Sequence, residues 1–269
     1  MHQQLNEGDF KVLQGIEFGK TFLEDIAAFS HSSLKKTDYH IKKLAKFDLI
    51  RSNGVKYTLS YYGFDILALN AMYKKKIIRS IGDQIGYGKE SDIYEILAFN
   101  DKTYILKIHR EGFSFKKVLN NRPNMYKRNW FNISTKSALR EKEALSRLYS
   151  SVSVPKPIAT NRHFIVLEKI DGTMLKYTYL EDPEWFFEGI INEIRKSYHC
   201  GIVHGDLSEY NILIDGDRVV LIDWPQFIYS KEDMADKILT RDIKKIVYYF
   251  IRKYSLNKEI NDVLKKIKD

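Results

Sequence analysis

The sequence is poor in cysteine, in long apolar runs and in acidic residues. Its 269 residues include one cysteine, Cys200, which excludes an internal disulfide and fits a reducing cytosol. No apolar run is long enough to cross a bilayer, and the N-terminal residues lack the pattern of a signal peptide. These absences predict a cytoplasmic protein that does not bind a membrane.

The shortage of acidic residues leaves a surplus of positive charge. There are 44 Lys and Arg residues against 35 Asp and Glu residues, which gives a net charge of +9. Such a surplus often means only a lysine-rich solvated surface, but clustering on one module favours a polyanionic partner. Basic clusters occur within residues 1–80, at Lys35-Lys36, Lys42-Lys43 and Lys74–Lys76. RNA, DNA and a ribonucleoprotein all fit, and the charge alone does not choose among them.

Residues 1–76 have the pattern of a winged helix followed by a linker helix. The spacing of apolar residues predicts three helices, over residues 10–18, 22–29 and 37–47. Asn53-Gly54 lies between two strand-like runs and predicts a hairpin, because both residues can take a positive φ in a tight turn. Ser60 is placed to cap the linker helix, from Tyr61 to about Lys75. Three helices followed by a hairpin are typical of a winged helix, in which the hairpin forms the wing.

In residues 77–269, the spacing of apolar residues first becomes typical of strands and later of helices. Strands are expected over residues 81–85, 92–99, 103–109 and 164–170. Residues 111–136 are polar and basic and predict a mobile loop. Helices are expected over residues 137–149, 182–199, 233–254 and 257–268, with Val154–Pro157 ending the first. A run of strands with one inserted helix, followed by a mostly helical half, predicts an α+β bilobal domain with lobes at about 77–170 and 171–269.

The most informative stretch runs from His204 to Trp224. It places Asp206, Asn211 and Asp223 at the spacing of the base and metal ligands of kinase-type phosphoryl transfer. Asp206 is the candidate base or positioning group, and Asn211 with Asp223 are the candidate metal ligands. His204 is expected to support the scaffold, and a later acid, Asp242, to bond the backbone of this loop.

A candidate ATP cradle precedes this stretch. It lies between two strand-like runs, which excludes a P-loop of the strand-to-helix kind, although two glycines in a hairpin are by themselves a weak signal. The residues of the cradle are Gly86, Gly88, Lys89, Glu90, Ser91 and Ile93.

The candidate cation for the phosphates is Lys107. It lies in the middle of an apolar strand, where a lysine is costly to bury without a partner. Glu141 shares a helix face with Ala138 and Leu145, so it is the expected partner. Glu143 lies on another face and is expected to be a solvated charge.

These motifs resemble the RIO family of atypical serine/threonine protein kinases, in particular its second subfamily, which carries an N-terminal winged helix. The resemblance rests on Gly-x-Gly-Lys-Glu-Ser at 86–91, on His-Gly-Asp-Leu-Ser-Glu-Tyr-Asn at 204–211, and on Ile-Asp-Trp-Pro-Gln at 222–226. Ordinary protein kinases have Asp-Phe-Gly in place of Asp223-Trp224-Pro225. Trp224 stands where family members often have Phe, and this change leaves the metal ligand untouched.

The resemblance implies a trimmed bilobal kinase joined to a winged helix, using ATP with Mg²⁺ or Mn²⁺. It implies that backbone groups of Glu168 and Ile170 meet the adenine and that Asp223 accepts the γ-phosphoryl group transiently. It also implies an ATP-dependent step in the maturation of the small ribosomal subunit. The expected partners are the precursor of that subunit and its rRNA, with a protein as a further substrate.

Three features depart from ordinary peptide kinases. Gly205 replaces the Arg that grips a phosphorylated activation loop, and Ser208 occupies the place of the catalytic-loop Lys. About eighteen residues separate Asp223 from Asp242, too few for an activation segment and a peptide-docking platform. We therefore expect slow ATP turnover, gated by a ribosomal partner, rather than efficient peptide phosphorylation.

Two other functions fit parts of the pattern. Small-molecule kinases of the aminoglycoside or choline kinase type share His-Gly-Asp-x-x-x-x-Asn and lack an activation segment, but they explain neither the winged helix nor Pro225-Gln226. A nucleic-acid-binding regulator with a kinase-like scaffold explains the winged helix but has no need of intact Lys107, Asp206 and Asp223. The basic third helix favours contact with an RNA backbone over duplex DNA.

Overall fold

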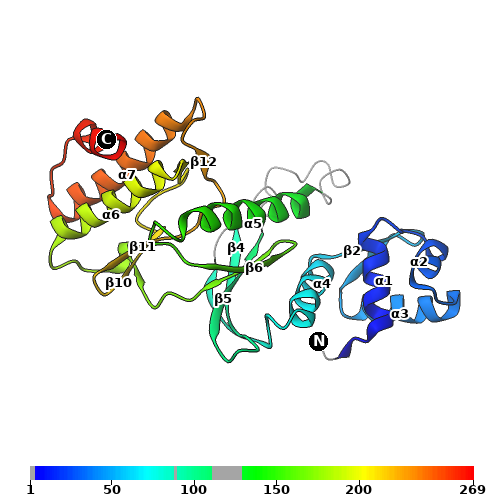
Figure 1. Ribbon diagram of the computed structural model, residues 1–269. Coiled ribbons are helices and arrows are strands. Elements are labelled where there is room, and N and C mark those ends of the chain that lie inside the picture. The colour runs from blue at the N-terminus through cyan, green and yellow to red at the C-terminus, as the bar shows by residue number, and fades with distance from the viewer. Residues whose placement is uncertain (1–3, 88–89, 111–128) are drawn as a thin grey trace. The chain divides into compact units, whose positions relative to one another are not determined.

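The chain folds into two units, each with its own hydrophobic core (Figure 1). The computed structural model describes residues 4–87, 90–110 and 129–269. The N-terminal unit consists of residues 1–80 with 98–100, and the C-terminal unit of residues 81–97 with 101–269. The predicted boundaries after residues 76 and 170 stay predictions.

The N-terminal unit is a winged helix, as predicted. Its elements are α1 (Glu7–Glu17), α2 (Leu23–Ser30), α3 (Leu34–Lys46), β1 (Ile50–Ser52), β2 (Tyr57–Leu59) and the linker helix α4 (Tyr61–Lys74). Polar side chains fix where the helices begin: Asn6 forms a capping box with Asp9, and Ser60 caps α4 by accepting from the Gly63 amide. Buried Asp9 also joins α1 to α3, because its carboxylate contacts His40 at 2.7 Å and Lys43 at 2.6 Å.

The wing differs from the predicted tight turn. Gly54 has a φ of 93°, but Asn53 keeps a negative φ. The Asn53 side chain instead accepts hydrogen bonds from the amides of Val55 and Lys56, at 3.2 and 2.8 Å. The side chain of Asn53 therefore closes the longer loop from Ser52 to Tyr57, and only one of the two residues uses a left-handed conformation.

A five-stranded sheet follows the linker helix. Its strands are β3 (Ser80–Tyr87), β4 (Ser91–Leu97), β5 (Thr103–His109), β6 (Pro157–Asn161) and β7 (Phe164–Glu168), in the order β3-β4-β5-β7-β6. Sequence analysis located no strand at β6, because Pro157 reads as a breaker. A proline without an N–H is tolerated at the start of an edge strand, and β6 is an edge.

Helix α5 (Asn129–Leu148) packs against β5, β6 and β7 (Figure 1). It begins eight residues before the predicted start at residue 137, so the expectation of a loop over 129–136 was wrong. The first turns carry no apolar stripe, because the inward positions are occupied by Ser134 and Ser137. Residues 111–128 of the expected loop lie outside the described residues.

The remainder of the C-terminal unit is mostly helical. Its elements are β8 (Thr173–Met174), a short 3₁₀ helix (Leu175–Tyr177), α6 (Pro183–His199), β9 (Ile202–Val203), β10 (Ile212–Asp215), β11 (Arg218–Leu221), β12 (Ile228–Tyr229), α7 (Ala235–Tyr254) and α8 (Ile260–Lys268). Asp182 caps α6 and Pro183 begins it, as predicted.

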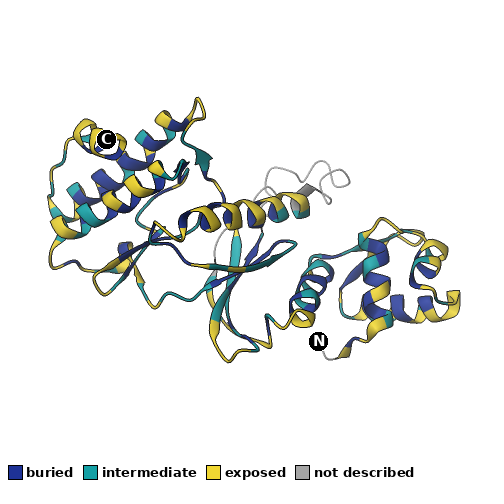
Figure 2. Ribbon diagram, viewed as in Figure 1, coloured by how far each residue is buried: buried dark blue, intermediate teal, exposed yellow. Residues whose placement is uncertain are grey.

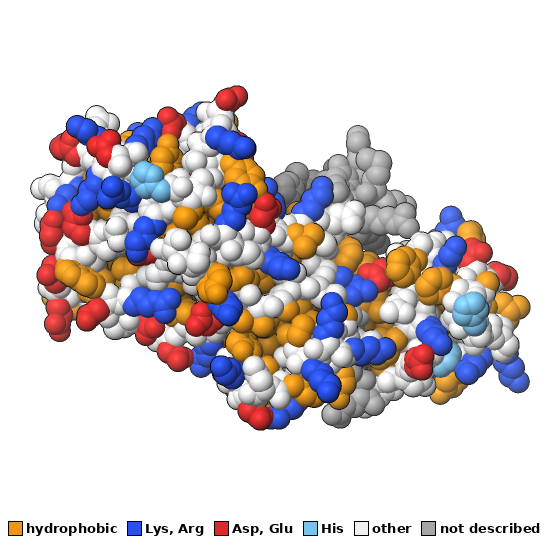
Figure 3. Space-filling model, in the orientation of Figure 1, with side chains coloured by type: hydrophobic (Ala, Val, Ile, Leu, Met, Phe, Trp, Pro, Cys, Tyr) orange, Lys and Arg blue, Asp and Glu red, His pale blue; other side chains and the backbone are white. Residues whose placement is uncertain are grey.

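The large core of this unit joins α5 to α6 and α7. It includes Leu145, Phe187, Trp224, Ile246 and Phe250, all 1% exposed or less. Figure 2 shows that α6 and α7 each carry buried and exposed positions along their length, as amphipathic helices do. Figure 3 shows Lys and Arg side chains spread over the visible surface of each unit. No helix among the described residues is long and apolar enough to cross a membrane.

Candidate active site

A buried ion pair lies at the centre of the site. Lys107 is on β5, between β4 and β7, and its Nζ lies 2.8 Å from Oε1 of Glu141 on α5. The two side chains are 8% and 1% exposed. The predicted partnership of Lys107 with Glu141 is therefore confirmed. Glu143 lies on the exposed face of α5 and accepts a hydrogen bond from the Tyr229 hydroxyl.

His109 is a third member of this cluster. It lies two residues after Lys107 on the same side of β5, and its Nε2 is 2.8 Å from Oε2 of Glu141. An ionised carboxylate can only accept, so Nε2 donates. Burial alone would raise the pKa of Glu141, but Lys107 and His109 outweigh it and lower the pKa to about 2. Glu141 is therefore ionised, with one oxygen for each partner.

Lys107 also reaches the carboxylate of Asp223. Nζ of Lys107 and Oδ1 of Asp223 are 2.6 Å apart, and Asp223 is 43% exposed on the open side of the cluster. Asp223 has a φ of 70°, in the left-handed region. Trp224, which follows it, is fully buried and donates from its ring nitrogen to the carbonyl of Leu221 at 3.1 Å. The buried indole anchors the segment that presents Asp223.

The loop after β9 is fixed from both sides. Gly205 has a φ of 84°, and a Cβ at this position would collide with the carbonyl oxygen of Gln226. The Gly205 amide donates to Oδ2 of buried Asp242 at 2.9 Å, which confirms the predicted bond from Asp242 to this backbone. Arg241, beside Asp242 on α7, donates to the carbonyl of Gly205.

His204 supports the same loop, as predicted. Its Nε2 lies 2.9 Å from the carbonyl of Ile222, and its Nδ1 lies 3.3 Å from the amide nitrogen of Asp206. The carbonyl accepts and the amide donates, so the ring is neutral with its proton on Nε2. Burial lowers the pKa of His204 although the bond to Ile222 and the nearby aspartates favour the charged form. A neutral His204 thus links the segment before Asp206 to the segment before Asp223.

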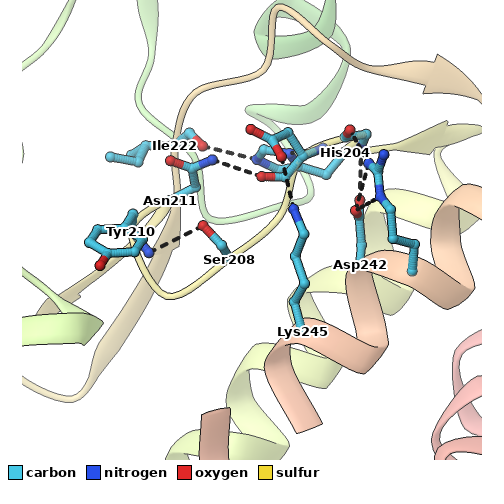
Figure 4. A network of polar contacts seen from close by, with 10 residues as sticks. His204, Ser208, Tyr210, Asn211, Ile222, Asp242 and Lys245 are labelled. Carbon is cyan, nitrogen blue, oxygen red and sulfur yellow. Dashed lines mark hydrogen bonds and ion pairs between the residues drawn. The ribbon is translucent and has the colours of Figure 1, made fainter. Parts of the chain in front are cut away.

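Asp206 and Asn211 lie together in this loop, and the side chain of Asp206 is 58% exposed. The side-chain amide nitrogen of Asn211 donates to the backbone carbonyl of Asp206 at 2.8 Å, which leaves the amide oxygen of Asn211 available to a ligand. A lysine from α7, Lys245, places its Nζ 2.9 Å from Oδ1 of Asp206. Figure 4 shows Asp242 and Lys245 pointing from one helix toward the loop.

The oxygens of Asn211 and Asp223 suit a magnesium ion. An amide oxygen and a carboxylate are hard donors of the kind that Mg²⁺ prefers, with phosphate oxygens and water completing its coordination. Among the residues that the structure describes, no three His, Cys, Asp or Glu side chains gather to hold a metal by themselves. Two protein ligands therefore fit a metal that arrives with a phosphate group.

Comparison with known proteins identifies the family. Residues 92–263 match the RIO domain, and residues 2–75 match the domain described as Rio2, N-terminal. The chain belongs to the RIO family, in its Rio2 branch. It is 37% identical over 249 residues to the RIO-type serine/threonine-protein kinase Rio2 of Methanocaldococcus jannaschii, covering 88% of this chain and 92% of that protein.

Other RIO kinases agree with this placement. The serine/threonine-protein kinase rio2 of Schizosaccharomyces pombe is 34% identical over 274 residues, covering 95% of this chain and 79% of that protein. The crystal structure of the Rio2 kinase-ADP/Mg2+-phosphoaspartate complex from Chaetomium thermophilum is similar, with a TM-score of 0.86 and 29% identity. It covers 100% of this chain and 88% of that one. The predicted winged helix followed by a RIO kinase domain is confirmed.

The residues of the predicted ATP cradle are described in part. Ile93 on β4 is the register partner of Lys107, and Ser91 is the partner of His109, so this strand borders the cation. Gly86 lies one residue before the end of β3, close to the side chain of Ile93, and Glu90 precedes β4. Gly88 and Lys89 lie outside the described residues. Glu168 ends β7 and Ile170 follows it, and their predicted contacts with adenine stay predictions.

The sequence did not predict the hydrogen bonds that join α5 to the segment after Asp223. Arg140, next to Glu141, donates from Nε to the carbonyl of Pro225 at 3.0 Å and from Nη2 to the carbonyl of Phe227. Its guanidinium also lies 4.5 Å from the centre of the Phe227 ring. In this RIO kinase, Arg140 therefore holds the helix of Glu141 against the segment that follows Asp223. In the sequence, the only hint of this contact was a positive charge next to Glu141, the residue predicted to point inward.

Proposed function

We propose that this RIO kinase binds ATP with Mg²⁺ and catalyses transfer of the γ-phosphoryl group. One observation carries the proposal: Lys107 is held between buried Glu141 and half-exposed Asp223, at 2.8 and 2.6 Å. Kinase-type phosphoryl transfer needs such a fixed cation on the phosphates beside a carboxylate that binds the metal.

The remaining residues have roles that follow from their positions. Lys107 would bind the α- and β-phosphates, and the strand ends around Gly86 and Ser91 would lie over the triphosphate. When bound, Mg²⁺ would neutralise charge on the phosphates, and Asn211 and Asp223 would hold it. Asp206 would orient the attacking oxygen. Backbone groups of Glu168 and Ile170 at the end of β7 are proposed to meet the adenine.

We further propose that Asp223 accepts the phosphoryl group. A carboxylate oxygen of Asp223 attacks the γ-phosphorus and forms an O–P bond, while the bond to the bridging oxygen breaks and ADP leaves with that electron pair. Water then cleaves the acyl phosphate, which restores the carboxylate and releases inorganic phosphate. The similar structure from Chaetomium thermophilum is an ADP/Mg2+-phosphoaspartate complex, which supports an aspartate as the phosphoryl acceptor.

The proposed setting is the maturation of the small ribosomal subunit in the cytoplasm. The third helix of the winged helix exposes Lys35, Lys36 and Lys46, together with the ring of Tyr39. Cations beside an exposed aromatic ring fit contact with rRNA of the subunit precursor. The short segment between Asp223 and Asp242 favours ATP hydrolysis on that particle over phosphorylation of a protein substrate.

The first experiment measures phosphate release from ATP in the presence of Mg²⁺. Asp206→Asn should reduce turnover at least about 100-fold, the usual scale for a group that positions or deprotonates the nucleophile, while nucleotide binding is retained. Asp217→Asn, in the exposed turn between β10 and β11, is the matched control and should turn over ATP like the wild type. Equal turnover by the wild type and Asp206→Asn would sink the assignment.

The second experiment locates the phosphate. After incubation with γ-labelled ATP, the wild type should carry phosphate that hydroxylamine removes, as an acyl phosphate does, and mass spectrometry should place it on Asp223. Asp223→Asn also removes a metal ligand, so loss of label in that variant is not sufficient by itself. A phosphate mapped to any other residue would count against the proposed acceptor.

A further inference from the structure

Arg140 joins α5 to residues 225–229, which we call the linking segment. Its Nε donates to the carbonyl of Pro225 at 3.0 Å, and its Nη2 donates to the carbonyl of Phe227. The guanidinium also lies 4.5 Å from the centre of the Phe227 ring. The next residue on α5, Glu141, points inward to the buried ion pair, about 100° around the helix. One turn of α5 therefore bonds both the ion pair and the linking segment.

The linking segment lies between Asp223 and the loop after β9, which we call the catalytic loop. It begins two residues after Asp223. The carbonyl oxygen of Gln226 passes so close to Gly205 of the catalytic loop that a Cβ there would collide with it. At the far end, Ile228 of β12 pairs with Val203 of β9, the strand that leads into the catalytic loop. A shift of the linking segment would therefore move both Asp223 and the catalytic loop.

The proposed reaction needs a support for Asp223 other than Lys107. Nζ of Lys107 lies 2.6 Å from Oδ1 of Asp223. Because Lys107 would turn to the phosphates when ATP binds, this contact cannot hold the carboxylate during the reaction. Asp223 also has a φ of 70°, a conformation that persists outside glycine only where the surrounding structure fixes it. The bonds from Arg140 meet backbone carbonyls, so they stay in place when Lys107 turns to the nucleotide.

We propose that Arg140 is a positioning residue for phosphoryl transfer. It fixes the linking segment, so that Asp223 keeps its place for Mg²⁺ while Lys107 binds the phosphates. This inference rests on the proposed function. Removing a contact that supports a metal-binding carboxylate typically lowers metal affinity or activity by about 10–100-fold. Backbone carbonyls are always present, so this support needs no phosphorylation, unlike the activation-loop grip of the Arg that Gly205 replaces.

Arg147 provides a matched control on the same helix. It also meets the linking segment, because its guanidinium lies 5.2 Å from the centre of the Tyr229 ring. Arg140 and Arg147 are both exposed residues of α5 that lie over an aromatic ring. Among the described residues, however, Arg147 forms no hydrogen bond to the backbone of the linking segment. The two arginines therefore differ in the pair of hydrogen bonds next to Asp223.

The first test titrates Mg²⁺ into the full chain in the presence of a fluorescent ADP analogue, N-methylanthraniloyl-ADP. Arg140→Met keeps an apolar stem but no donor, and it should need about tenfold more Mg²⁺ for the half-maximal change in fluorescence. Its affinity for the analogue in EDTA should equal that of the wild type, because Lys107 still binds the phosphates. Arg147→Met should match the wild type in both measurements.

The second test measures phosphate release from ATP at saturating Mg²⁺. Arg140→Met should lower kcat about tenfold or more, with the KM for ATP within about twofold of the wild type, and Arg147→Met should change neither. Arg140→Lys keeps a cation that can donate to one of the two carbonyls, so its kcat should lie between those of Arg140→Met and the wild type. Tryptophan fluorescence confirms that each variant is folded.

Two results would overturn the inference about Arg140. One is an Arg140→Met variant that matches Arg147→Met in its need for Mg²⁺ and in kcat. The other is an Arg140→Met variant that loses affinity for the analogue in EDTA as strongly as in Mg²⁺, which would mark a contribution to the fold alone.

The wild type separates this inference from the proposed function. If the wild type responds to Mg²⁺ and releases phosphate while Arg140→Met and Arg147→Met behave alike, only the inference about Arg140 fails. If the wild type releases no phosphate from ATP, the proposed function fails and the inference fails with it. A higher need for Mg²⁺ and a lower kcat in Arg140→Met, with unchanged binding in EDTA, support the inference.

Discussion

Replacing Glu141 by glutamine should destabilise the C-terminal unit by about 2–3 kcal/mol. The glutamine has the same shape, but its amide carries no charge and can no longer accept from both Lys107 and His109. Breaking one side of a buried ion pair generally costs about 3–5 kcal/mol, because the other charge stays buried and unpaired. Lys107 keeps Asp223, whose carboxylate is half-exposed and therefore screened by water, so the expected loss lies below that range.

Urea unfolding followed by tryptophan fluorescence measures this loss of stability in the C-terminal unit. All three tryptophans of the chain lie at or after residue 130, so the signal reports the C-terminal unit. Glu143→Gln, two residues away on the exposed face of α5, is the control and should change the free energy of unfolding by less than about 0.5 kcal/mol. If the two variants lose equal stability, or Glu141→Gln loses none, the buried cluster does not hold the sheet and α5 together as described.

The remaining predictions concern the catalytic loop and use the same fluorescence assay. Gly205 and Gly201 share a φ of 84°, but only at Gly205 would a Cβ collide with backbone, so Gly205→Ala should lose stability by at least about 2 kcal/mol more than Gly201→Ala. Equal losses would contradict the close approach to Gln226. His204 has a lowered pKa and is neutral when folded, so the unfolded chain binds more protons and stability should fall as the pH drops below about 6.5. His204→Gln should make the free energy of unfolding less dependent on pH, whereas the exposed control His199→Gln should leave that dependence unchanged. A dependence that persists in His204→Gln and is lost in His199→Gln would contradict a neutral His204.

The residues of the proposed site could be located from the sequence because their spacing is local. Asp206 and Asn211 lie within one loop, and Asn211 turns back to bond the Asp206 carbonyl. Glu141 followed from helical periodicity, since the face that carries Ala138 and Leu145 also carries Glu141 inward. These predictions needed only the helical spacing of apolar residues or a short distance between residues along the chain.

Residues that act across long intervals were not predictable in the same way. Lys245 meets Asp206 from 39 residues away, and Arg140 meets Pro225 from 85 residues away. The sequence around a surface lysine or a helical arginine does not show whether its side chain reaches a partner far along the chain. The early start of α5 was hidden for a different reason, because its first inward positions are serines and give no hydrophobic period.

Phosphate release from ATP by Lys107→Met tests the central claim most directly. Lys107 is the residue that Glu141 and Asp223 hold in common, and methionine keeps its apolar stem while removing the charge. The matched variant is Lys142→Met, on the exposed face of α5. We predict that Mg²⁺-dependent phosphate release is lost in Lys107→Met and retained in Lys142→Met, with both proteins folded by tryptophan fluorescence. Undiminished release by a folded Lys107→Met would contradict a phosphoryl-transfer site built around this lysine.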